Sequence, residues 1–242
     1  MNTVPTTALR TRIKICGLTQ ESDVDCAVAA GADAIGFVLY PKSPRYVTVA
    51  RAAQLAQRLP PFVAPVLLFV NATINEIHHA TARIGNATLQ MHGDETPEFC
   101  LQASNQGAYP LIRAARIPLG DSAKGFNLIK YAEDYSYAQA LLLDAHVEGY
   151  GGGGQAFNWS LLPPNVNAHL VLSGGLNAAN VAEGIRLLRP RCKTLSVDVS
   201  SGVEALDANG APLKGIKDPL RITAFVAAVR AADAQFAQGT SS

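Results

Sequence analysis

Short apolar segments bounded by turn residues recur along the whole chain, and each has the length of a β-strand. The run VAPVLLFV at residues 63–70 is continuously apolar, without alternating polar positions. Such a run is typical of a parallel strand that is covered on both faces. We expect eight strands, at residues 12–16, 33–39, 63–70, 87–91, 109–115, 139–144, 168–173 and 194–199.

Segments with helical periodicity lie between these strands. In the first of them, Val24, Ala27 and Val28 recur at helical spacing behind Thr19, which we expect to cap the helix. The predicted helices span residues 20–30, 49–58, 73–84, 95–105, 178–189 and 218–234, with a short helix inside the weakly periodic stretch 119–138.

Alternating strands and helices leave two architectures, a closed (βα)8 barrel and an open doubly wound sheet. The count of eight strands favours the barrel, so we predict an α/β fold with a single parallel TIM barrel over residues 12–235. We expect residues 1–11 and 236–242 to be loosely ordered termini. Such a barrel has its active site at the C-terminal ends of its strands, although any one polar residue there can also be ordinary turn chemistry.

Composition excludes several classes of partner. The chain has 242 residues, of which 48% are hydrophobic and 16% are charged, as in a globular protein. Twenty basic and nineteen acidic residues give a net charge of +1, so we expect no nucleic-acid partner. The longest apolar run is far too short to cross a bilayer, and the N-terminus has no apolar core of signal-peptide length. We therefore expect a cytoplasmic protein without membrane contact, whose partner is a small molecule.

The four cysteines are widely spaced and form no CxxC pair, which argues against a zinc site and fits a reducing compartment. Cys16 ends the first strand beside a glycine. A cysteine inside a strand is most simply a small hydrophobic residue, but the end of a strand is where α/β enzymes hold their chemistry. The other three, Cys26, Cys100 and Cys192, fit core or surface thiols.

Strand alternation places polar side chains relative to one another. Lys14 and Cys16 share one face of the first strand. If Cys16 points into the barrel mouth, Lys14 points into the barrel below it and needs a carboxylate partner, for which Asp198 is the candidate. Asp144 ends the sixth strand. A hydrolase dyad of Cys16 and His92 is disfavoured, because the first and fourth strands lie on opposite sides of a barrel.

Two glycine-containing loops follow the seventh and eighth strands. In the first loop, SGGLN, backbone N–H groups can approach an anion at the start of the next helix, which we expect Asn177 to cap. The second, SSGVE, offers two hydroxyls, a glycine and a short helical turn. In a (βα)8 barrel these loops make the usual phosphate pocket, although the glycines could also serve only as turns. The candidate phosphate residues are Gly174, Gly175, Ser200, Ser201 and Gly202.

Two other patterns support neither a cofactor nor a metal. The glycine-rich run at 149–155 fits GxGxxG, but it lies away from the strand end and no acidic residue follows at the spacing that holds a ribose. It has Gln155 and Ala156 where a P-loop needs Lys and Ser or Thr, so we interpret it as a mobile flap or a loop against the ligand. His78 and His79 face different directions on a helix and lack a matched partner for a metal.

Eight motifs occur in a fixed order between Arg12 and about Val229: KICGLT, GFVLYPKSPRYV, LFVN, LQMHGDE, LLLDA, LSGGLN, VDVSSGVE and GIKD. In these motifs the chain resembles the phosphoribosylanthranilate isomerase family, (βα)8 enzymes of tryptophan biosynthesis. The resemblance implies an aldose–ketose isomerase that converts N-(5-phosphoribosyl)anthranilate to the 1-deoxyribulose derivative by an Amadori rearrangement. It also implies that neither a metal nor an organic cofactor takes part, and it leaves open a monomer or a homodimer.

The resemblance also implies roles for individual residues. Cys16 of KICG would be the general base, and Asp144 of LLLDA the general acid. Arg45 of SPR would hold the anthranilate carboxylate, where a planar guanidinium suits bidentate pairing. His92 and Asp198 match family positions near the substrate, and both could instead be structural. The two glycine-containing loops would hold the phosphate.

The implied chemistry explains these residue types. A protonated carboxyl can protonate the furanose ring oxygen, so that the ring opens to an imine. The imine acidifies the C2′ proton, which a thiolate can remove. Cationic groups nearby would bring the pKa of such a thiol toward neutrality.

Two alternatives and two departures from the family pattern remain. A related histidine-pathway isomerase performs the same rearrangement with two aspartates, which Cys16 argues against. A barrel that has lost catalysis could bind a sugar phosphate as a sensor or complex subunit, which the joint presence of Cys16, Asp144 and Arg45 argues against. The glycine-rich loop lacks the family's hydroxyl residue, and the segment 119–138 matches poorly.

Overall fold

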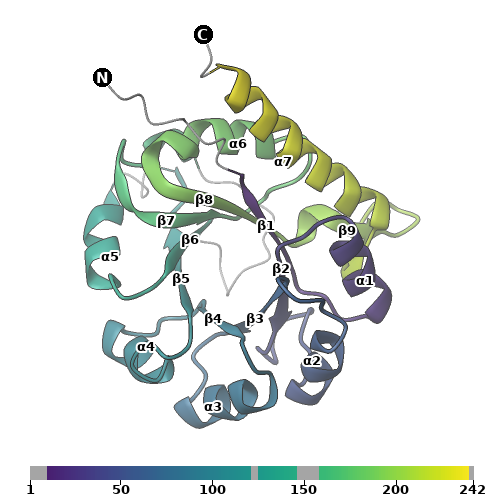
Figure 1. The fold of residues 1–242 in the computed structure, drawn as a ribbon, viewed down its shortest axis with the longest axis vertical. Helices are drawn as coiled ribbons and strands as arrows, with labels where there is room; N and C mark the ends of the chain where they lie inside the picture. Colours follow the sequence, from purple (N-terminus) through teal and green to yellow (C-terminus); the bar gives the residue numbers. More distant parts are fainter. Residues whose placement is uncertain (1–9, 121–124, 146–157, 240–242) are drawn as a thin grey trace.

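Eight parallel strands close into one barrel in the computed structural model, which describes residues 10–120, 125–145 and 158–239. Each strand pairs with the next along the chain, and the last pairs with the first, as Figure 1 shows. The predicted barrel is therefore confirmed. Its strands are β1 (Arg12–Cys16), β2 (Ala34–Val38), β3 (Ala64–Phe69), β4 (Thr88–Met91), β5 (Leu111–Ile117), β6 (Ala140–Ala145), β7 (Val166–Leu172) and β8 (Cys192–Val199).

Helices form a ring around the outside of the barrel (Figure 1). They match the predicted helices, and α5 lies inside the weakly periodic stretch 119–138. The α-helices of the described residues are α1 (Glu21–Ala29), α2 (Val49–Ala56), α3 (Ile74–Arg83), α4 (Pro97–Ala103), α5 (Leu128–Asp134), α6 (Val181–Leu188) and α7 (Pro219–Gly239).

Two of the expected helix caps are wrong. Helix α1 has Gln20 as its N-cap, because the Thr19 hydroxyl instead donates to the carbonyl of Gly215 at 2.7 Å. Helix α6 begins after Asn180, and Asn177 accepts a hydrogen bond from the N–H of Ala179 in the turn that precedes the helix. In both cases a polar residue expected to start a helix holds a neighbouring loop in place.

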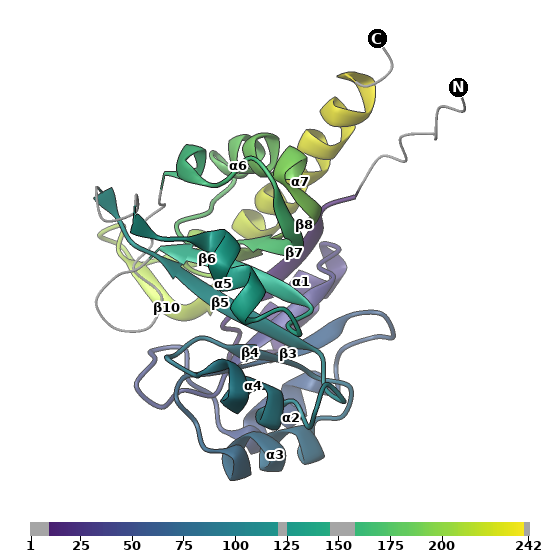
Figure 2. The same cartoon turned by 90° about the vertical axis from the view of Figure 1, so that its left-hand side faces the viewer.

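An antiparallel hairpin follows β8 and lies at the end of the barrel toward which the strands run (Figure 2). The short helical turn expected after β8 is present at Ser201–Val203. It leads into β9 (Glu204–Leu206) and β10 (Pro212–Lys217), which the hydrophobic pattern did not predict. The hairpin matters for the site because it brings Glu204 and Lys217 to the barrel mouth.

Side chains alternate between two apolar layers. Ile13 and Ile15 of β1 belong to the large core between the barrel and its helices. Ala114, Leu142 and Val171 form a small separate cluster inside the barrel. The buried charged side chains of Lys14 and Asp198, on the paired strands β1 and β8, also lie inside the barrel.

The described chain ends are attached to the barrel. Thr11 is buried, and its N–H donates to the Asp233 carboxylate on α7 at 2.9 Å. Helix α7 extends to Gly239. Helix α7 thus continues past residue 235, and Thr11, the residue before β1, is bonded to it. Within the described ranges, none of the helices combines the length and the apolar character that a membrane span requires.

Candidate active site

A buried ion pair joins the first and last strands inside the barrel. Lys14 and Asp198 are register partners of β1 and β8, and Lys14 Nζ lies 2.8 Å from Asp198 Oδ1. Both side chains are nearly inaccessible to water. The predicted partnership is confirmed, and it satisfies two charges that would otherwise be costly to bury.

Cys16 lies one step above Lys14 on the same face of β1. It is a free thiol and is buried. Gly36 on β2 leaves space for it, because a Cβ at Gly36 would lie 2.7 Å from the Cys16 Sγ and 3.1 Å from the Lys14 Cε. The strand end therefore presents a thiol directly against a lysine side chain.

The surroundings of the Cys16 thiol raise its pKa above the usual value. Burial raises the pKa of Cys16 most, and Asp198 also raises it, while Lys14 and Lys217 lower it. The net shift is upward, so the expectation that nearby cations bring this pKa toward neutrality is wrong: burial outweighs them. Burial alone would lower the pKa of Lys14, but Asp198 and Cys16 raise it above its usual value, so Lys14 stays charged.

Asp144 and His92 meet on the opposite side of the mouth. Asp144 lies near the end of β6 and His92 directly follows β4, and the His92 Nε2 is 3.1 Å from the Asp144 Oδ2. The Gln90 side chain donates to His92 Nδ1 at 3.1 Å, which leaves Nε2–H to face the carboxylate. His92 thus pairs with Asp144, and a dyad with Cys16 stays disfavoured.

Arg45 contacts an internal carboxylate. Its Nε and Nη2 lie 2.6 and 3.0 Å from the two carboxylate oxygens of Glu204, which is fully buried. Lys214 and Lys217 lie 3.7 and 3.6 Å from the same carboxylate. Burial would raise the pKa of Glu204, but Arg45, the Gly215 N–H and Lys217 hold it below its usual value. Three cations therefore surround one anion, and the cluster keeps an excess of positive charge.

The two candidate phosphate loops pack against each other beside this cluster. Gly174 and Gly175 have φ angles of +76° and +63°, which other residues rarely adopt. A Cβ at Gly202, in the second loop, would collide with the carbonyl of Leu176 in the first. Lys217 Nζ donates to the carbonyl of Ser200 at 2.9 Å. Backbone and hydroxyl groups thus converge near a buried ammonium.

Known proteins match this chain over nearly its whole length. A family model described as N-(5′-phosphoribosyl)anthranilate (PRA) isomerase matches residues 13–228. The chain belongs to this family. An N-(5′-phosphoribosyl)anthranilate isomerase from Leptothrix cholodnii is 55% identical over 232 residues, covering 96% of each chain.

Solved structures of PRA isomerases share the fold. The enzyme from Thermotoga maritima has 36% identity and a TM-score of 0.76, with 91% of this chain and 99% of that chain covered. A PRA isomerase solved in complex with reduced 1-(o-carboxyphenylamino)-1-deoxyribulose 5-phosphate has 34% identity and a TM-score of 0.73, with the same coverage. Every site residue expected from the sequence, from Cys16 to Gly202, lies inside the region that the PRA isomerase family model matches.

Sequence reasoning missed three polar residues of this PRA isomerase site. Gln90 lies two residues before His92, on the same face of an otherwise apolar strand, and this alternation could have found it. Glu204 and Lys217 belong to the hairpin, whose pairing is irregular and leaves no clear periodicity. The glycine-rich run at 149–155 lies outside the described residues. Among those that are described, no group of three metal-ligating side chains occurs.

Proposed function

We propose that the protein is an N-(5′-phosphoribosyl)anthranilate isomerase that catalyses an Amadori rearrangement by acid–base chemistry, with Cys16 as the base and Asp144 as the acid. The observation that carries this assignment is that a thiol on β1 and a carboxyl on β6 face the same barrel mouth as two packed glycine-containing loops. Family membership supports the reaction, and the two steps require only proton transfers.

Asp144 opens the furanose ring as the general acid, with His92 as its hydrogen-bond partner. The acid form of Asp144 passes its own carboxyl proton to the furanose ring oxygen as the C1′–O bond breaks, while the Nε2–H of His92 keeps its 3.1 Å hydrogen bond to the Asp144 Oδ2. The anilino nitrogen supplies the electron pair that forms the imine. His92 then stabilises the resulting carboxylate through the same hydrogen bond.

Removal of the C2′ proton falls to Cys16. The thiol must first lose its proton, and the charged Lys14 beside it favours the thiolate against the effect of burial. The thiolate takes the C2′ proton, and the electron pair of the C–H bond moves into the imine to give an enolamine. This enolamine tautomerises to the ketone, so no electrons leave the substrate.

The substrate carries two anionic groups, a carboxylate and a phosphate. They are bound by the cations around Glu204 and by the two glycine-containing loops. Arg45 uses the Nε and Nη2 edge of its guanidinium for Glu204, so the Nη1 side is the part offered to the anthranilate carboxylate. Gly174, Gly175, Ser200, Ser201 and Gly202 surround the phosphate. The buried charge of Lys217 adds attraction for that dianion.

The test is turnover of fluorescent phosphoribosylanthranilate by the purified protein in the presence of a metal chelator. We expect full activity in the wild type and a loss of about 10²-fold to 10⁴-fold in Cys16→Ala and in Asp144→Asn, with unchanged circular dichroism. Full activity in either variant contradicts the role of that residue.

The same assay separates the alternatives. Binding of the substrate without turnover would indicate a sugar-phosphate sensor, and turnover of only the histidine-pathway aminoaldose would indicate the related isomerase. We also propose a cytoplasmic enzyme that works as a monomer or a homodimer, which sedimentation equilibrium would resolve.

A further inference from the structure

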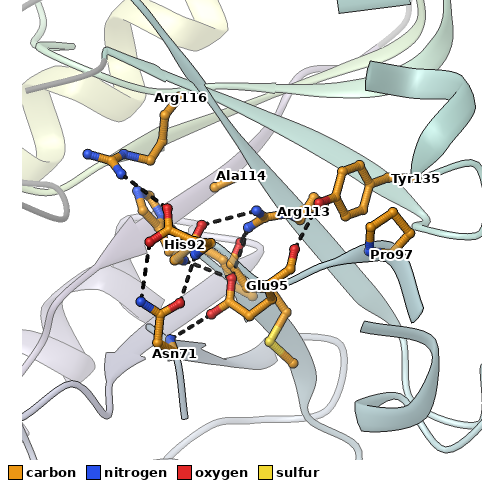
Figure 3. Close-up of polar contacts among 12 residues, drawn as sticks. Asn71, His92, Glu95, Pro97, Arg113, Ala114, Arg116 and Tyr135 are labelled. Carbon is orange, nitrogen blue, oxygen red and sulfur yellow. Dashed lines mark hydrogen bonds and ion pairs between the residues drawn. The ribbon is translucent and has the colours of Figure 1, made fainter. Parts of the chain in front are cut away.

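A further buried ion pair lies outside the barrel wall, behind the strand end that carries His92. Arg113 of β5 alternates with Ala114, which faces the barrel interior, so Arg113 points outward toward the helices. Its Nη1 lies 3.0 Å from the Glu95 Oε2, and both side chains are at least 95% buried. The guanidinium carbon lies 5.0 Å from the centre of the Tyr135 ring (Figure 3).

Arg113 holds the backbone on both sides of His92. Its Nη1 donates to the carbonyl of Met91 at 2.9 Å, and its Nη2 donates to the carbonyl of Gly93 at 3.0 Å. These are the carbonyls of the residues immediately before and after His92. A planar guanidinium with fixed donors can span two carbonyls and one carboxylate at once, which a lysine cannot.

Glu95 completes the support from the acceptor side. Its Oε2 accepts from the N–H of Gly93 at 2.9 Å, and its Oε1 accepts from the N–H of Asn71 at 2.8 Å. The Tyr135 hydroxyl donates to the Glu95 carbonyl at 2.8 Å, so the backbone of Glu95 is held as well. Gly93 is therefore fixed at both its N–H and its carbonyl.

Stability alone does not require this arrangement. A buried ion pair contributes little to stability compared with apolar side chains of similar volume, because both charges must be removed from water. What the pair does provide is a fixed backbone position at Met91 and Gly93. His92 lies between these two residues, and its Nε2 is 3.1 Å from the Asp144 Oδ2.

We propose that Arg113 and Glu95 are positioning residues, which clamp the peptide groups flanking His92 and thereby hold its imidazole against Asp144. Neither touches the reacting atoms. This inference rests on the proposed function in one respect, because its effect on catalysis passes through the acid Asp144. Its structural part, the fixed orientation of the His92 ring, does not depend on the reaction.

The test compares Glu95→Gln and Arg113→Lys with Asp233→Asn. The control removes a charge from a slightly less buried ion pair, between Asp233 and Arg189, at the end of the barrel where β1 begins. We expect the two clamp variants to lower kcat about tenfold to hundredfold with little change in KM, because a displaced catalytic group costs rate. The control should lower only the melting temperature. A kcat for Glu95→Gln within about twofold of the wild type overturns the proposal.

Two further measurements test whether the clamp variants lower kcat through His92. In a His92→Ala background, Glu95→Gln should change kcat by less than about twofold, because the clamp then has no imidazole to position. The ¹⁵N resonances of the His92 ring should shift in Glu95→Gln and stay unchanged in Asp233→Asn. Full additivity with His92→Ala, or an unchanged His92 spectrum, contradicts the clamp. A wild type that does not isomerise phosphoribosylanthranilate overturns the proposed function instead, and the His92 spectrum then decides on the clamp.

Discussion

The two sides of the barrel mouth hold their polar groups by different means. On the β1 and β8 side, a formal ion pair between Lys14 and Asp198 lies directly below Cys16. On the β4 and β6 side, Gln90, His92 and Asp144 form a chain of hydrogen bonds, each at 3.1 Å. An ion pair therefore lies beside the proposed base, whereas hydrogen bonds between neutral and charged groups orient the proposed acid.

The two kinds of interaction differ in how precisely the backbone around them must be placed. A charge interaction acts over several ångströms and tolerates small displacements, so Lys14 can lower the pKa of a thiol whose burial raises it. A hydrogen bond weakens steeply when its angle changes. The acid side therefore needs a fixed backbone, which the Arg113–Glu95 pair behind β4 provides. Substitutions that remove an ion-pair partner should therefore have larger effects than substitutions that remove one neutral hydrogen bond.

The largest effect on stability is expected from Lys14→Met on the charged side. This change leaves Asp198 buried without its partner, and we expect a loss of about 3–5 kcal/mol in the free energy of unfolding, measured by urea titration. The double variant Lys14→Met with Asp198→Leu should recover most of that loss, because no unpaired charge remains. A single variant as stable as the wild type would show that the pair carries no buried charge.

A smaller effect, in substrate affinity, is expected from the titration of Lys217. Burial lowers the pKa of Lys217 to about 8, against the opposing effect of Glu204. The ammonium is therefore charged below that pH and loses its charge as the pH rises. KM should rise by roughly tenfold between about pH 7 and pH 9, since one pKa unit corresponds to about 1.4 kcal/mol.

Lys217→Arg is the matched control for that titration. Its guanidinium stays charged throughout this pH range, so its KM should stay nearly constant. A wild-type KM that is equally flat would show that this charge does not contribute to binding.

The smallest effect on stability is expected from Gln90→Leu on the hydrogen-bonded side. Gln90 is fully buried but uncharged, and its loss removes one neutral hydrogen bond to His92. We expect about 1 kcal/mol of destabilisation in the same urea titration. A loss as large as that of Lys14→Met would remove the distinction between the two sides.

Contacts between neighbouring strands were predictable from the sequence, and contacts across the barrel were not. The Lys14–Asp198 pair follows from side-chain alternation, because β1 and β8 are adjacent once the barrel closes. His92 and Asp144 lie on β4 and β6, which are not neighbours, so their contact depends on side-chain lengths inside the barrel. The sequence supplied both residues but not their pairing.

The contacts of Arg113 and Glu204 could not be predicted from the sequence, because they depend on how distant segments pack. Arg113 is one of two arginines in an otherwise apolar strand, and only the fold shows that it faces the rings of Tyr131 and Tyr135 at the end of α5. Glu204 follows the short helical turn Ser201–Val203, and its burial depends on how the hairpin folds back over Arg45. Resemblance identified Arg45 but gave no sign of this internal partner.

The central claim is that Cys16 removes the C2′ proton after Asp144 has opened the ring. The most direct measurement is single-turnover rearrangement of phosphoribosylanthranilate that carries deuterium at C2′, compared with unlabelled substrate. We predict slower rearrangement of the labelled substrate by the wild type, and rearrangement of both substrates slowed by about 10²-fold to 10⁴-fold in Cys16→Ala. Rearrangement by Cys16→Ala at the wild-type rate, with the same isotope effect, would contradict the account.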